Sequence, residues 1–223
     1  MRRFIFAALA VAGAIGTANA GEEAGFYVGF DAGQSSVDLD QRGLDNSLIS
    51  IFNDLGFAVL DGSSETSEDS FTYGLILGYQ VLPWLALEAT YMDLGEAEYK
   101  ARGTISDGVA VASSRFDFNG SAKGPAVSAI GMYPFANGWS VLGRAGMVFT
   151  DIDYDIGVSI EDQSSSRSIS RSNENFLLGA GVGFTALPWT VRLEYQQISD
   201  LGDKDIAGEA DGSRVTLATI FRF

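Results

Sequence analysis

The sequence predicts an all-β fold: an eight-stranded antiparallel transmembrane β-barrel with short turns on one side and long loops on the other. The first observation is the period of two in the last ten residues, which is typical of a strand about long enough to cross a bilayer when tilted. Apolar or aromatic residues dominate one face of this segment: Val215, Leu217, Thr219, Phe221 and Phe223. On the other face, only Ile220 interrupts a run of polar or small residues. The second observation is a hairpin pattern that occurs three times, and the third is the polar character of the remaining connections.

The first twenty residues are expected to form a secretory signal peptide. Arg2 and Arg3 precede an apolar run from Phe4 to Ile15, and residues 18–20 provide small side chains for cleavage. Cleavage before Gly21 leaves one barrel domain, residues 21–223, which the length of the chain allows. The chain has no cysteine, so disulfides cannot hold this exported protein together. The hydrogen-bond ladder of a closed barrel can do so.

Eight strands follow from the alternating segments. We expect them at about residues 25–35, 71–82, 84–95, 115–134, 138–151, 174–187, 189–199 and 213–223. An even number places both termini on the short-turn side, which we expect to be periplasmic. A helical membrane protein is the rival, because Ser70–Leu87 is uncharged and long enough to span. Its apolar residues come at every second position, so two strands and a turn fit better.

The three hairpins lie at Gly78–Tyr91, Met132–Arg144 and Gly183–Tyr195. Each has an apolar strand, a short turn with Pro or Asn-Gly, and a second alternating strand. Aromatic side chains gather around the turns: Tyr79, Trp84, Tyr133, Trp139, Phe184 and Trp189. Such rings are typical of a membrane–water interface, so we expect the turns to share one rim. Ordinary hairpin aromatics in a soluble sandwich are the alternative.

The other connections are polar and are expected to be extracellular loops, at roughly Ser36–Ser70, Glu96–Ser114, Asp151–Glu174 and Ser199–Gly212. The first contains apolar residues at helical spacing: Leu44, Leu48, Ile51, Phe52 and Leu55. Gly56 is a plausible C-cap for this helix. We expect a short amphipathic helix at the barrel rim that covers the mouth or touches lipid headgroups. A helix that binds a partner is the alternative.

Four charged residues are expected inside the barrel: Glu88, Arg144, Arg192 and Glu194. Their neighbours in the strands are apolar and should face lipid, where a charge at mid-bilayer would cost about 2–4 kcal/mol. An eight-stranded barrel is only wide enough for side chains to fill. We therefore expect a salt-bridged network that occludes the lumen, because buried charges must pair. A gate that exchanges partners and passes small ions is the alternative.

Composition excludes several classes of function. Histidine is absent, which removes Ser-His-Asp and Cys-His catalysis and histidine-liganded metals, so no enzyme activity, catalytic residue or cofactor is expected. Hydrolysis by a bare carboxylate pair is the alternative. The acidic balance, 29 Asp and Glu against 14 Lys and Arg, argues against binding nucleic acid. Asp151, Asp153 and Asp155 resemble the start of a calcium loop, but the required Gly and Glu do not follow. No specific metal site is expected, although loose Ca²⁺ or Mg²⁺ binding shared with lipopolysaccharide phosphates is an alternative.

Several segments together resemble the OmpA-type outer-membrane β-barrel family over nearly all of the mature chain. They are Gly78-Tyr-Gln-Val81 with Pro83 and Glu88, Gly146-Met-Val148, Arg192-Leu-Glu-Tyr-Gln196 and Phe221-Arg-Phe223. The resemblance implies a Gram-negative cell outer membrane and a structural or surface role, with adhesion or porin-like activity as alternatives. It implies outer-membrane lipid and lipopolysaccharide as partners. Barrel-assembly machinery would recognise the terminal strand with Phe221 and Phe223, and an extracellular partner of the loops is a further candidate.

Carried over residue by residue, Glu88, Arg192 and Glu194 match the family's interior charge network. Two positions depart from it. Gly183 stands where another inward glutamate is expected, and Ile130 where a lysine is expected. The resemblance therefore implies a network with fewer charges, which weakens any gating role. The peptidoglycan-binding domain of full-length relatives is also expected to be absent, so the chain should not tether the cell wall by that route.

Overall fold

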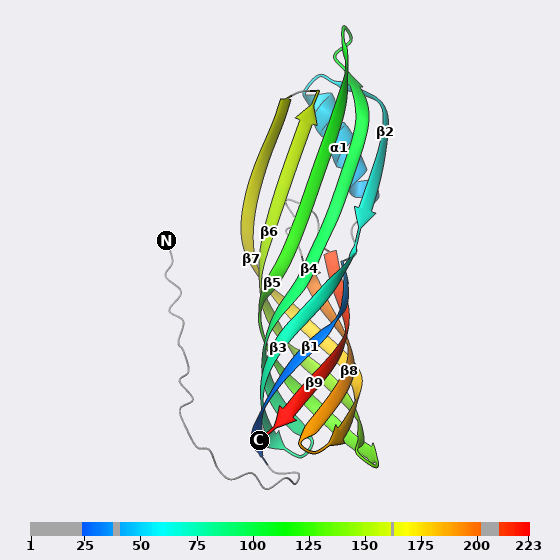
Figure 1. The fold of residues 1–223 in the computed structure, drawn as a ribbon. Coiled ribbons are helices and arrows are strands. Elements are labelled where there is room, and N and C mark those ends of the chain that lie inside the picture. Colours follow the sequence, from blue (N-terminus) through cyan, green and yellow to red (C-terminus); the bar gives the residue numbers. More distant parts are fainter. Residues whose placement is uncertain (1–23, 38–40, 162, 202–209) are drawn as a thin grey trace, which may run out of the picture.

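In a computed structural model, residues 24–37, 41–161, 163–201 and 210–223 are described, and they form one antiparallel sheet and one helix (Figure 1). The strands are β1 (Gly25–Val37), β2 (Ala58–Ser67), β3 (Asp69–Leu82), β4 (Leu85–Ser106), β5 (Val111–Ala136), β6 (Trp139–Ile160), β7 (Gln163–Ala186), β8 (Trp189–Leu201) and β9 (Ala210–Arg222). The helix is α1 (Gln41–Asp54). The expected signal peptide, residues 1–20, lies outside the described residues.

Eight of these nine strands close into a ring. Consecutive strands pair from β3 to β9, and β1 joins the two ends by pairing with both β3 and β9. The closing ladder between β1 and β9 runs from Tyr27↔Arg222 to Val37↔Gly212. The prediction of an eight-stranded antiparallel barrel is confirmed. β2 lies outside the ring and pairs with the second half of β4, from Glu98 to Ser106.

The three tight turns lie at the same end of the ring as the carboxyl terminus (Figure 1). They connect β3 to β4, β5 to β6, and β7 to β8. In the middle turn, both Asn137 and Gly138 have positive φ angles, 31° and 88°, as a two-residue hairpin with the twist of its strands requires. We call this the turn end of the barrel and the opposite one the far end.

Side chains of the ring alternate between a buried interior and an exposed apolar belt. In β3, Ile76 and Gln80 are buried, whereas Leu75 and Leu77 point outward and Leu77 is 54% exposed. The same outward pattern of large apolar residues follows β1, β4, β8 and β9. A continuous apolar surface of this extent is not stable in water and indicates contact with hydrocarbon. Among the described residues, no helix is long and apolar enough to cross a membrane.

The interior is arranged in layers along the barrel axis. The turn-end apolar layer consists of Tyr27, Ile76, Ala86, Ile130, Leu142, Ala218 and Ile220. The far-end apolar layer consists of Met92, Leu94, Ala126, Val148, Leu177, Ile198 and Leu201. Charged side chains lie between them, as β4 illustrates with Ala86, then Glu88, then Met92. Ile220 breaks the alternation of the last strand because its side chain belongs to the turn-end layer.

Two connections that were expected to be loops are mostly strand, which corrects the sequence prediction. The ladders β4–β5 and β6–β7 continue to Ser106↔Val111 and Ile160↔Gln163, well past the expected strand ends. The expected first loop contains α1 and β2, whereas the last lies largely outside the described residues. The extension is stable because inward side chains beyond the far-end layer form another apolar cluster, with Tyr99, Phe118, Ile152 and Tyr154 at its centre.

The helix predicted from apolar spacing is confirmed, but it lies on the extended sheet rather than at the barrel rim. Leu44 and Leu48 pack against the apolar cluster around Tyr99. The Tyr99 hydroxyl donates a hydrogen bond of 2.5 Å to Asp45 Oδ1, and Gln41 Nε2 donates to the Ser64 carbonyl at 3.2 Å. Burial, and then the adjacent Asp45 carboxylate, raise the pKa of the Tyr99 phenol. Gly56 ends the helix with a φ of 87°, as expected of a C-cap.

The apolar belt gives the first prediction. Replacing Leu77 by Arg should lower the free energy of unfolding in lipid vesicles by about 2–4 kcal/mol, because the cation would face hydrocarbon. Urea titration followed by circular dichroism measures this. Val111→Arg is the matched control, since Val111 is 60% exposed but lies at the tip of the extended sheet. Equal losses in the two variants would contradict the assignment of the belt.

Candidate functional site in the barrel interior

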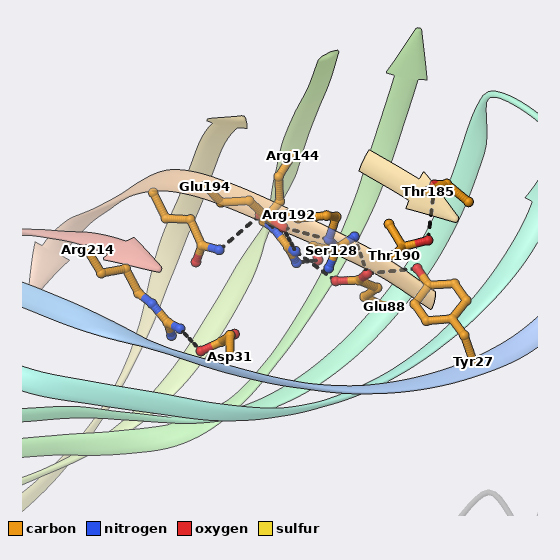
Figure 2. A network of polar contacts seen from close by, with 11 residues as sticks. Tyr27, Asp31, Glu88, Ser128, Arg144, Thr185, Thr190, Arg192, Glu194 and Arg214 are labelled. Atoms are coloured by element: carbon orange, nitrogen blue, oxygen red, sulfur yellow. Dashed lines mark hydrogen bonds and ion pairs between the residues drawn. The ribbon is translucent and has the colours of Figure 1, made fainter. Parts of the chain in front are cut away.

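The interior charges come from strands that are distant in sequence but adjacent or opposite in the ring. Glu88 lies on β4, Arg144 on β6, and Arg192 and Glu194 on β8, and all four point into the lumen (Figure 2). Their inward direction follows from the period of two, because Leu87, Leu193 and Tyr195 on the same strands occupy the outward positions. The structure thus brings together the four charged residues that the sequence placed inside.

These four side chains form one compact ion network. Arg144 donates from Nη2 to Glu88 Oε2 at 2.7 Å and from Nε to Glu194 Oε2 at 2.9 Å. Arg192 Nη1 donates to Glu88 Oε1 at 2.7 Å, and its Nε lies 3.0 Å from Glu194 Oε1. Each guanidinium therefore contacts both carboxylates. The four side chains are at most 3% exposed, so the charges depend on one another for compensation.

Neutral groups add further hydrogen bonds to the network, although Arg192 Nη2 and Gln196 Oε1 are buried without a hydrogen-bond partner among the described residues. The Tyr27 hydroxyl donates to Glu88 Oε1 at 2.7 Å, and Arg144 Nη1 donates to Ser128 Oγ at 2.7 Å. Gln196 Nε2 donates to Glu194 Oε2 at 3.1 Å. The carboxylates thus accept bonds from several strands, and the network ties β1, β4, β5, β6 and β8 together across the lumen.

A second buried ion pair lies between β1 and β9. Arg214 Nη2 donates to Asp31 Oδ1, and both residues are buried (Figure 2). This pair crosses the seam at which the ring closes, since β1 and β9 are neighbours there. Together, Asp31, Glu88 and Glu194 face Arg144, Arg192 and Arg214, so acidic and basic charges balance in this set.

Glycines provide the space that the long side chains occupy. A Cβ on Gly78 would overlap the Tyr27 ring, and one on Gly181 would lie 3.0 Å from Glu194 Cγ. Gly183, which stands where the resemblance implied a glutamate, would place a Cβ 3.4 Å from Arg192 Cγ. The Arg192 side chain therefore lies over Gly183.

Sequence reasoning did not assign Tyr27, Asp31, Ser128 or Arg214 to the interior network. A signal was present for two of them. In β1, the alternation puts Asp31 on the same face as Tyr27, whereas Phe26, Val28 and Phe30 lie on the outward face. In β9, Arg214 directly precedes the outward Val215 and therefore faces inward. Ile130, the other departure from the family pattern, is fully buried in the turn-end apolar layer and lies directly opposite Arg144 in the β5–β6 ladder.

The predicted aromatic residues lie near the tight turns with exposed side chains. These are Tyr79, Trp84, Tyr133, Trp139, Phe184 and Trp189. Trp139 contacts Phe184 with ring centroids 5.2 Å apart, and Trp189 contacts Phe221 at 5.0 Å. Phe221 in turn lies 5.3 Å from Phe223. The rings thus gather at the turn end of the barrel, and their interfacial role and the assembly role of the last two stay predictions.

The acidic segment that resembles a calcium loop is part of a strand. Asp151, Asp153 and Asp155 lie on the outer face of β6, and each accepts a hydrogen bond from a serine of β7: Ser172, Ser170 and Ser168, respectively. Within the described parts of the chain, no three acidic side chains come together in a way that could hold a metal ion. These aspartates therefore take part in cross-strand hydrogen bonds rather than in a calcium-binding loop.

Comparison with known proteins identifies relatives. A family model described as an OmpA-like transmembrane domain matches residues 21–223. Outer membrane protein P5 of Haemophilus influenzae is 31% identical over 189 residues, which cover 81% of this chain and 46% of that protein. Outer membrane protein A of Serratia marcescens is 26% identical over 163 residues, which cover 73% of this chain and 42% of that protein. The chain thus spans about half the length of the curated relatives it matches.

Solved structures of outer-membrane proteins are also similar to this chain. The match to Neisserial surface protein A has 13% sequence identity and a TM-score of 0.49. It covers 91% of this chain and 100% of the Neisserial chain. The match to Ail of Yersinia pestis has 14% sequence identity and a TM-score of 0.40. It covers 90% of this chain and 97% of the Ail chain.

Removing one cation from the interior ion network should be costly. Arg144→Ala leaves Glu88 and Glu194 each short of one partner, and we expect a loss of about 3–5 kcal/mol in unfolding free energy. Urea unfolding in lipid vesicles measures it. Arg115→Ala, which removes a surface ion pair with Asp117, is the control and should have no measurable effect. Adding Glu88→Gln to Arg144→Ala should recover part of the loss. Indistinguishable unfolding of the Arg144 and Arg115 variants would overturn this view of the network.

Proposed function

The chain belongs to the family of OmpA-like transmembrane domains, and from this premise we propose that it is a structural and surface protein of the outer membrane whose lumen is closed to ions. It is an integral outer-membrane β-barrel. The proposal adds that the interior ion network, together with the apolar layers on either side, occludes the barrel. Its role would then be to stabilise the envelope and to display the extended sheet, rather than to transport solutes.

The observation that carries the proposal is the order of the layers along the axis. An ion that enters from either end has to pass apolar side chains before it reaches the ion network, such as Ile130 and Leu142 at the turn end or Val148 and Leu177 at the far end. Apolar constrictions exclude ions because they cannot replace the hydration shell. Behind each layer lie charges that are already paired with one another. Conduction would require both layers to open as well as an exchange of ion-pair partners.

The alternatives use different parts of the molecule. A narrow porin-like channel needs an open path, which the paired charges and both apolar layers disfavour. An adhesin or receptor would use the strands beyond the apolar belt, and this role is compatible with a closed lumen. No catalytic role is part of the proposal, since the sequence contains neither histidine nor cysteine.

The proposed partners follow from the surface of the barrel. Outer-membrane lipid would cover the apolar belt, and the exposed aromatic residues of the turn end would lie at the periplasmic interface. Lipopolysaccharide would surround the extended sheet on the extracellular side, and the aromatic terminal strand would engage barrel-assembly machinery. Cleavage of residues 1–20 would release the barrel domain, residues 21–223.

Conductance distinguishes a closed barrel from a channel. We expect the refolded protein to give no single-channel currents in planar bilayers. Arg192→Ala should also remain silent, because both apolar layers persist when the ion network is weakened. Heat-modifiable electrophoretic migration serves as the control that each inserted sample is folded. Reproducible currents from the unchanged protein would refute the proposal, and currents that appear only in Arg192→Ala would show that the ions alone close the lumen.

A further inference from the structure

A cleft lies in the extended sheet, beyond the apolar belt and distinct from the interior ion network. It has a volume of about 350 Å³. The helix α1 forms one wall through Leu48, Ile49 and Phe52. The opposite wall comes from β2, β4 and β5, including Val59, Ile105 and Phe116. Its size falls at the lower end of the range for small-molecule sites, and its lining is mostly apolar, as in such sites.

The cleft is hollow because small residues occur opposite one another on the inner face of the strands. Gly62 of β2 pairs directly with Gly103 of β4, and Ser64 pairs with Ala101. Ser114 of β5 pairs with Gly103 from the other side. Backbone therefore forms much of the floor. A Cβ on Gly103 would lie 2.5 Å from the Asp61 carbonyl oxygen, so the chain cannot fill this part of the hollow with a side chain at that position without distortion.

One charged side chain projects from the helix into this apolar cleft. Asp45 is half-buried, and its carboxylate accepts a hydrogen bond from the Tyr99 hydroxyl. Among the described residues, no cationic group lies within ion-pair distance of the Asp45 carboxylate. Arg102 borders the cleft, but its side chain is exposed on the outer face, between the inward Ala101 and Gly103. A half-desolvated carboxylate without a counter-ion attracts a cation.

Aromatic rings lie beside this carboxylate. Phe116 lines the cleft and contacts the fully buried Tyr99 ring, with ring centroids 6.1 Å apart and an edge-to-face geometry. Phe52 lines the cleft from the helix side. Aromatic faces attract organic cations, and they do so most strongly where water is excluded. The cleft thus combines an apolar cavity, the Asp45 carboxylate and aromatic rings. Asp61 also lines it, and its carboxylate accepts a hydrogen bond from the Thr104 amide.

We propose that this cleft binds a small organic ammonium compound with an apolar body. The ammonium group would lie against Asp45 and the rings of Phe52 and Phe116, and the apolar body would fill the hollow above Gly62 and Gly103. An anion of the same shape would be rejected by Asp45. This binding site is independent of the proposed closure of the lumen, because the two are separated by the far-end apolar layer.

Calorimetric titration tests the proposal on the full chain in maltoside micelles, which contain neither charges nor ammonium groups. The probe is phenethyltrimethylammonium, and 3-phenylpropionate is its anionic counterpart. We expect saturable binding of the cation and none of the anion. Asp45→Asn should weaken binding roughly tenfold, as the loss of one partly screened ion pair implies. Ser114→Leu should abolish it by filling the cavity.

The matched control is Asp54→Asn, which removes a carboxylate from the same helix but not from the cleft lining and should leave binding unchanged. Circular dichroism and heat-modifiable migration establish that each variant is folded. The absence of binding to the unchanged protein would overturn the proposal. Equal affinity for the anionic probe, or undiminished binding in folded Asp45→Asn or Ser114→Leu, would also overturn it.

Discussion

Hydrocarbon offers no hydrogen-bond partner to the backbone, and the structure depends on this constraint. Each strand within the apolar belt has a neighbour on both sides, and the ladder between β1 and β9 removes the edges that an open sheet would expose. Once the ring is closed, the period of two fixes which side chains meet lipid and which fill the lumen. The inward charges then have to compensate one another electrostatically, because a narrow barrel leaves no room for bulk water around them. These charges belong to Glu88, Arg144, Arg192 and Glu194.

The constraint ends where the strands leave the membrane, and the architecture changes there. Beyond the belt, β4 to β7 continue with polar outer faces, and β2 adds to β4. Water can satisfy backbone groups in this part, so closure is no longer required. The inner face still carries apolar residues such as Ile152 and Tyr154, and α1 covers part of it through Leu44 and Leu48. The same strands therefore form a sealed barrel within the belt and a helix-covered sheet outside it.

The ring was predictable from the sequence because strands that face lipid carry apolar side chains at nearly every second position, as in β9. The sequence also predicted the helix α1 from the spacing of Leu44 and Leu48. The extension of β6 and β7 was missed because their outer faces are rich in Ser and Asp, a composition that resembles a loop. The inner alternation of Ile152, Tyr154 and Ile156 was the available signal. Pairing between distant strands, such as Asp31 with Arg214, depends on ring closure and could not be obtained from local patterns.

Hydrogen exchange at the seam tests the central claim most directly. In lipid bilayers, the amides of β1 from Tyr27 to Gly33 and of β9 from Thr216 to Arg222 should be protected as strongly as those of the belt portions of β5 and β6, because each ladder is sealed on both sides. Nuclear magnetic resonance or mass spectrometry measures the protection. Rapid exchange confined to β1 and β9, with the other strands protected, would mean that the barrel is open and would contradict the account.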